Sequence, residues 1–93
     1  MRHILLIGAG RSSSSLINYL LANAVEQDWT LTVADFSEEL AKQKTGGNSK
    51  ATAIRFDVND ENQRRVEISK SDIVISMLPT HPVYSSRHLH RKQ

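Results

Sequence analysis

The sequence has no cysteine in its 93 residues, which excludes disulfide bonds, thiolate metal sites and a cysteine nucleophile. It also lacks a long hydrophobic run, and no stretch approaches the roughly 18 apolar residues that a membrane-spanning helix needs. The apolar run after Arg2 is too short for a secretory signal, and it leads into glycines instead of a cleavage site. We therefore expect a soluble, cytoplasmic protein with no membrane partner.

Charge of one sign is also scarce, since the formal net charge is only +2. Much of the basic excess lies in Arg87, Arg91 and Lys92, which have no acidic neighbour. This indicates a solvated tail rather than a basic face for nucleic acid, so we expect no nucleic-acid partner. An interaction module based on the tail is the weakest functional hypothesis. The length fits one domain over residues 1–82, followed by an unpatterned, flexible tail over residues 83–93.

Apolar or β-branched segments alternate along the chain with segments of helical periodicity. We expect strands over residues 3–7, 29–35, 51–57 and 72–78. We expect helices from the serines after the first glycines to about residue 26, from a Ser37 cap to about residue 44, and over residues 62–69 after an Asp60–Gln63 capping box. This alternation predicts an α/β fold with a parallel sheet, right-handed crossovers and strand order 3-2-1-4.

The turn after the first strand carries the strongest chemical signal. Gly8 and Gly10 follow a buried strand directly and lead into a helix, as in a dinucleotide-binding loop. In such a loop the first glycine allows the tight turn, the second lets the backbone approach the pyrophosphate, and the third lets the helix pack closely. The third position here is Ser13, which is small but weakens the pattern. The alternative is an ordinary strand-to-helix turn with a serine-rich cap.

Polar side chains at the start of this helix can add contacts to a phosphate. The hydroxyls of Ser12 and Ser13 can donate to the pyrophosphate beside the backbone N–H groups, and either serine can be the N-cap. Arg11 is placed to lie over the phosphates or to point into solvent. With Gly8 and Gly10, these three residues form the predicted phosphate site.

An acidic residue, Asp35, ends the second strand. A carboxylate there can accept hydrogen bonds from the adenine ribose hydroxyls and would repel a 2′-phosphate, so we expect NAD as the cofactor in preference to NADP. The preference is modest because Arg11, Lys42 and Lys44 are candidates to reach a phosphate. The alternative role for Asp35 is a turn-forming aspartate before the Ser37 cap.

The ends of the third and fourth strands face the same site, because ligands bind at the carboxyl ends of parallel strands. Asp57 and Val58 are expected beside the adenine, and Ser76 and Leu78 near the nicotinamide side of the pyrophosphate. For Asp57 a strand-ending role is an equal alternative, and for Leu78 core packing is favoured.

The four histidines give no metal or acid–base constellation. His3 lies near the start of the first strand, so we expect a structural role for it. His81, His88 and His90 lie near one another without an acidic partner, so we expect no metal site.

With these residues in view, the chain resembles the nucleotide-binding domain of the saccharopine dehydrogenase family. The resemblance covers residues 2 to about 82. The matching segments are Ile4-Leu5-Leu6-Ile7-Gly8-Ala9-Gly10-Arg11, Thr32-Val33-Ala34-Asp35, Phe56-Asp57-Val58-Asn59-Asp60, and Asp72-Ile73-Val74-Ile75-Ser76-Met77-Leu78-Pro79 with His81-Pro82. The last segment is the most specific, because a fourth strand that ends in a Ser-x-Leu-Pro turn is more typical of this family than of dehydrogenases at large.

The resemblance implies half of a doubly wound, Rossmann-like sheet and an NAD(P)-dependent oxidoreductase. Its substrate would be a secondary amine joining two amino acids, as in lysine metabolism. Members of the family are several times longer than this chain, so a substrate domain and the catalytic residues are expected elsewhere. Because the fourth strand would lie at an open sheet edge, we expect self-association or a fragment of a longer protein. The alternative function is a non-catalytic, nucleotide-sensing regulatory domain, which uses the same turn and acidic residue.

Overall fold

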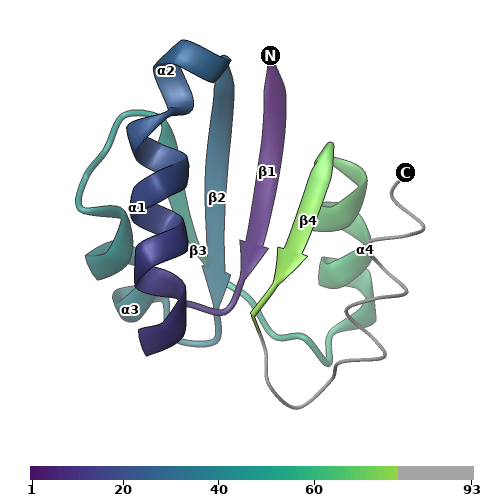
Figure 1. The fold of residues 1–93 in the computed structure, drawn as a ribbon. Helices are drawn as coiled ribbons and strands as arrows, with labels where there is room; N and C mark the ends of the chain where they lie inside the picture. The colour runs from purple at the N-terminus through teal and green to yellow at the C-terminus, as the bar shows by residue number, and fades with distance from the viewer. Residues whose placement is uncertain (78–93) are drawn as a thin grey trace.

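The computed structural model describes residues 1–77, which form a four-stranded sheet with helices on both faces (Figure 1). The strands are β1 (Arg2–Ile7), β2 (Trp29–Asp35), β3 (Ala51–Arg55) and β4 (Ile73–Ser76). Every neighbouring pair is parallel and the spatial order is β3-β2-β1-β4, which confirms the predicted α/β fold and strand order. The predicted tail lies outside the described residues, as do Leu78, His81, His88 and His90.

The helical elements follow the strands in alternation, with one interruption that the sequence pattern did not indicate. They are η1 (Arg11–Ser13), α1 (Ser14–Ala22), α2 (Ala24–Gln27), α3 (Glu38–Thr45) and α4 (Glu61–Ser69). The predicted first helix is broken at Asn23, whose side-chain amide donates to the Tyr19 carbonyl at 2.8 Å. Asparagine side chains compete with the backbone in this way, which explains the break. Asp28 then takes a left-handed conformation with φ 59° and ends α2.

The larger core lies between the sheet and the pair α1 and α3. It contains Ile4, Leu6, Leu31 and Val33 from the strands, Ile17 and Leu20 from α1, and Ala41 from α3. The smaller core lies on the opposite face, under α4, and contains Leu5, Ile7, Ala34, Phe56 and Val74, with Ile68 of α4 packed against it. Because β1 is buried on both faces, its continuous aliphatic sequence is explained.

Two of the three predicted helix caps form as expected. The Ser37 hydroxyl accepts from the Leu40 N–H at 3.2 Å, and the Asp60 carboxylate accepts from the Gln63 N–H at 3.1 Å. At the first helix the predicted position is confirmed, since Ser13 stands at the N-cap of α1, but its side chain makes no capping bond. Its hydroxyl donates instead to the Gly10 carbonyl at 2.6 Å.

A polar cluster joins β1 to β2 at the amino end of the sheet. The His3 ring places Nδ1 2.6 Å from the Thr30 hydroxyl and Nε2 2.8 Å from the Thr32 hydroxyl. The backbone N–H of His3 donates to the Asp72 carboxylate at 2.7 Å. These contacts confirm the structural role predicted for His3, at the end of β1 opposite the glycine loop.

No helix in the described part of the chain has the length and apolar character needed to cross a membrane.

Candidate functional site

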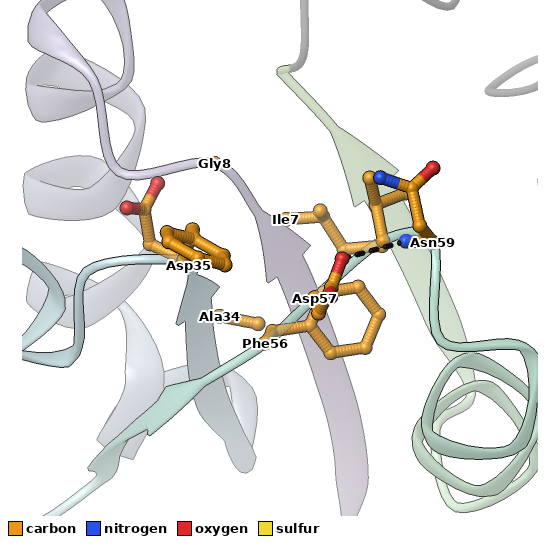
Figure 2. Close-up of a pocket in the computed structure, with 9 residues that line it drawn as sticks. Ile7, Gly8, Ala34, Asp35, Phe56, Asp57 and Asn59 are labelled. Carbon is orange, nitrogen blue, oxygen red and sulfur yellow. Dashed lines mark hydrogen bonds between the residues drawn. The ribbon is translucent and has the colours of Figure 1, made fainter.

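A pocket of about 270 Å³ opens at the carboxyl edge of the sheet, where the loops after β1, β2 and β3 meet (Figure 2). Its lining residues are Ile7, Gly8, Ala34, Asp35, Phe36, Phe56, Asp57, Val58 and Asn59. Of the predicted site residues, the pocket therefore brings together Gly8, Asp35, Asp57 and Val58. In doubly wound folds this edge is where ligands bind.

The loop after β1 turns at Gly8 and opens at Gly10. Gly8 has φ 103°, a conformation that side-chain-bearing residues rarely adopt, and its N–H donates to the Ala34 carbonyl at 2.7 Å. At Gly10 an added Cβ atom would meet no other atom within 4 Å. The two glycines therefore have different roles. The backbone conformation at Gly8 requires a glycine, whereas Gly10 leaves open space beside the loop.

The serines after the loop are placed unequally. Ser12 is exposed, while Ser13 is fully buried and its hydroxyl is taken by the Gly10 carbonyl. The small size of Ser13 thus allows the start of the helix to pack closely against the loop. Arg11 begins η1, and the phosphate contact predicted for it stays a prediction.

The Asp35 side chain joins the loop after β1 to the loop after β2 through two hydrogen bonds. One carboxylate oxygen accepts from the Ala9 N–H at 2.8 Å, and the other accepts from the Ser37 N–H at 2.9 Å. The bond to Ser37 is that of the turn-forming aspartate considered as an alternative above. Both oxygens are therefore bonded within the protein, and the predicted contact with a ribose hydroxyl stays a prediction.

The loop after β3 supplies the floor and one wall of the pocket. Phe56 is buried beneath it, and the Asp57 carboxylate accepts from the Asn59 N–H at 2.9 Å, the bond dashed in Figure 2. Asp57 therefore stabilises its own turn, and its side chain is half-buried beside Val58. The predicted adenine contact of these two residues stays a prediction.

The third strand ends at Arg55, two residues earlier than predicted, because its neighbour β2 ends at the paired residue Asp35. The Gln63 side chain of α4 donates to the Arg55 carbonyl at 2.8 Å and accepts from the Asp57 N–H at 3.1 Å. It thus satisfies the backbone on both sides of Phe56. A complete capping box would also have the Gln63 side chain accept from the Asp60 N–H. Here the Gln63 side chain makes the contacts with Arg55 and Asp57 instead, and the Asp60 N–H donates to the Asp57 carbonyl.

We expect Gln63→Ala to lower the free energy of unfolding by about 1–2 kcal/mol, because it leaves two backbone groups of the pocket loop without partners. Urea unfolding followed by circular dichroism measures the change. Asn62→Ala, at an exposed position on the same helix, is the matched control and should stay within about 0.5 kcal/mol of the wild type. Equal stability of the two variants would show that Gln63 does not hold this loop.

The fourth strand reaches the same edge beside β1. Ser76 pairs with Ile7 and is half-buried, and the Met77 N–H donates to the Ile7 carbonyl at 2.8 Å. Met77 packs against the larger core. The nicotinamide-side contact expected of Ser76 stays a prediction.

Sequence reasoning missed four residues that shape the site: Phe36, Arg55, Asn59 and Gln63. An aromatic residue directly after the strand-ending acid was a usable signal for Phe36. No sequence pattern near Gln63 predicts its hydrogen bonds to the end of β3, because these bonds depend on where α4 packs. Within the described residues, no group of three or more His, Asp or Glu side chains is placed to hold a metal ion.

Comparison with known proteins gives a consistent result. The family model described as saccharopine dehydrogenase NADP binding domain matches residues 4–89. A saccharopine dehydrogenase [NADP(+), L-glutamate-forming] from Pyricularia oryzae is 31% identical over 78 residues, which are 84% of this chain and 16% of that protein. The structure of an apo saccharopine dehydrogenase (L-Glu forming) from Saccharomyces cerevisiae aligns with a TM-score of 0.77 at 25% identity, over 99% of this chain and 19% of that one. The chain thus spans less than a fifth of the length of these two relatives.

These comparisons overturn the expectation of NAD as the preferred cofactor. The matching family is an NADP binding domain, and the Pyricularia relative is named for NADP(+). The inference failed because it treated Asp35 as a free carboxylate facing the ribose. Its two oxygens accept from the N–H groups of Ala9 and Ser37. An acidic residue at this position therefore does not by itself indicate whether the cofactor is NAD or NADP.

Proposed function

Because the chain belongs to the saccharopine dehydrogenase NADP binding domain family, we propose that it binds NADP(H) at the carboxyl edge of its sheet as the cofactor-binding part of an oxidoreductase. The observation that carries the proposal is the open space at Gly10, directly after a tight turn at Gly8. That arrangement leaves room for a pyrophosphate to contact the backbone, where N–H groups at a helix start attract anions.

Each predicted site residue has a role in this proposal. The loop from Gly8 to Gly10 and the exposed Ser12 receive the pyrophosphate, with Arg11 as a further cation. Ser13 and Asp35 hold the loop in shape through their bonds to the Gly10 carbonyl and the Ala9 N–H.

The adenosine then occupies the pocket between β2 and β3, against Phe36, Asp57 and Val58. The nicotinamide extends toward the end of β4, past Ser76, and Leu78, predicted for the same contact, lies outside the described residues. The position of the pocket on one side of the glycine loop and of β4 on the other supports this path.

The bound cofactor would supply hydride transfer to or from the carbon of a secondary amine joining two amino acids, the chemistry implied by the family resemblance to enzymes of lysine metabolism. The task of residues 1–77 is then to bind and orient the dinucleotide. His3, the histidine among them, is bonded to Thr30 and Thr32 at the far end of the sheet, so we assign the acid–base groups and the substrate site to other parts of the enzyme.

Titration of the 93-residue chain with NADPH tests the proposal, read by isothermal calorimetry and by the fluorescence of the reduced nicotinamide. We expect saturable binding with a dissociation constant below about 1 mM, equivalent to roughly −4 kcal/mol. NADH is the matched ligand, and it should bind more weakly. The absence of saturable binding of either dinucleotide, with the fold verified by circular dichroism, would refute the proposed function.

A further inference from the structure

Arg55 and Phe36 form a stacked pair at the rim of the pocket. The guanidinium carbon of Arg55 lies 4.7 Å from the centre of the Phe36 ring. Phe36 lines the pocket directly after Asp35 and is 64% exposed, and the strand register pairs Asp35 with Arg55. An exposed cation is therefore held on an aromatic ring beside the end of β2.

Over residues 1–77 the Arg55 guanidinium makes no ion pair, and it lies over the Phe36 ring. The neighbouring cations of α3 are occupied, since Lys42 pairs with Glu38 at 3.4 Å and Lys44 donates to the Ser14 hydroxyl. A cation–π contact orients a guanidinium while leaving its N–H donors available for an anion.

An NADP-binding domain needs a cation in this region. NADP differs from NAD by a phosphate on the 2′-oxygen of the adenosine ribose, and doubly wound folds place that ribose at the end of the second strand. Asp35 ends β2 here, and its carboxylate accepts from two backbone N–H groups and offers no donor to a phosphate. The first turn of α3 carries Glu38, which is paired with Lys42, and Glu39, so this turn offers no cation to a phosphate. The β3 side, where Arg55 lies, is left to receive it.

We infer that Arg55, held on the Phe36 ring, binds the 2′-phosphate of NADP(H) and is the residue by which this chain distinguishes NADP from NAD. The inference rests on the proposed function and adds to it the group that recognises the cofactor. A guanidinium suits the role because its fork of donors matches phosphate oxygens in a bidentate contact.

Arg55→Ala tests the inference, with NADPH and NADH titrated separately into the wild type and the variant. NADPH binding should weaken by about 10- to 100-fold, the range of a lost charge-assisted hydrogen bond, while NADH binding stays within about twofold. Adenosine 2′,5′-bisphosphate and 5′-AMP repeat the comparison without the nicotinamide. The 2′-phosphate should account for the loss in both pairs of ligands.

Arg65→Ala is the matched control, because Arg65 is an exposed arginine on α4 that pairs with Glu61 and does not line the pocket. Arg55→Lys keeps the charge without the planar fork and should recover part of the NADPH affinity. Phe36→Leu removes the ring that orients Arg55 and should weaken NADPH more than NADH.

The outcomes separate this inference from the function on which it rests. A wild type that binds NADPH, with Arg55→Ala binding it equally well, would overturn the assignment of Arg55 and leave the NADP(H) site in place. Equal losses for NADPH and NADH would also overturn it, because they would show a general effect on the pocket. A wild type that binds neither dinucleotide would overturn both.

Discussion

A side chain at Gly10 is expected to abolish NADPH binding while leaving the protein folded. Nothing within 4 Å would meet a Cβ atom at this position, and Gly10 is not among the glycines with positive φ. Gly10→Val should therefore change the free energy of unfolding by less than about 0.5 kcal/mol, as for other unstrained surface substitutions. The space it fills is where the proposed pyrophosphate contacts the backbone. Calorimetric titration with NADPH should show no saturable binding.

Gly47→Val is the reciprocal control for this experiment. Gly47 has φ 74° in the loop before β3, at the edge of the sheet away from the pocket. A side chain there should destabilise the protein by about 1–2 kcal/mol through backbone strain and leave the NADPH affinity of the folded chain unchanged. A Gly10→Val chain that binds NADPH as the wild type does would place the pyrophosphate away from the glycine loop.

Replacement of Asp35 is expected to have the largest effect on stability. Asp35→Ala removes the acceptor for the Ala9 N–H and for the Ser37 N–H, and Ala9 is fully buried. A buried donor left without a partner costs about 1–3 kcal/mol, and the lost bond to Ser37 adds to this, so we expect a total of about 3 kcal/mol. Because Asp35 joins the two loops, NADPH affinity should fall as well. Urea unfolding and NADPH titration measure the two effects.

Asp35→Asn separates the two bonds. Its amide oxygen can still accept from the Ala9 N–H, while its NH₂ group cannot accept from Ser37, so a loss of about 1–2 kcal/mol is expected. A different result would change the role of Asp35. If Asp35→Ala kept full stability and lost only NADPH affinity, the carboxylate would act on the ribose and not as the tie between the loops.

The sequence predicted the fold well because its signals are local. The aliphatic run of β1, the β-branched run of β2 and the glycine pair after Thr45 each reflect short-range chemistry, and strand order follows from the handedness of parallel connections. The site was predicted less completely because its geometry depends on contacts between distant residues. Asp35 meets Ala9 across 26 positions, and the pairing of Gln63 with β3 depends on the placement of α4. The NAD expectation failed for this reason.

The serines show the same limit on a smaller scale. A serine before a helix predicts a cap, and Ser37 forms one, whereas Ser13 donates to the Gly10 carbonyl. Residue type and position do not distinguish the two cases. What distinguishes them is that Ser13 is fully buried beneath a loop whose carbonyl lies within its reach.

The polar cluster at His3 fixes the register of β1 against β2, which the apolar core alone does not determine. The residues from Ile4 to Ile7 are all large aliphatics, so sliding β1 by two positions along β2 would return every side chain to its own face with little loss of burial. Such a slide would carry the glycine loop roughly 7 Å along the sheet edge, away from Asp35. Of the alignments that differ by two positions, only the observed one lets the His3 ring bond to both Thr30 and Thr32. A polar contact at the amino end of β1 thus sets the position of the glycine loop along the sheet edge.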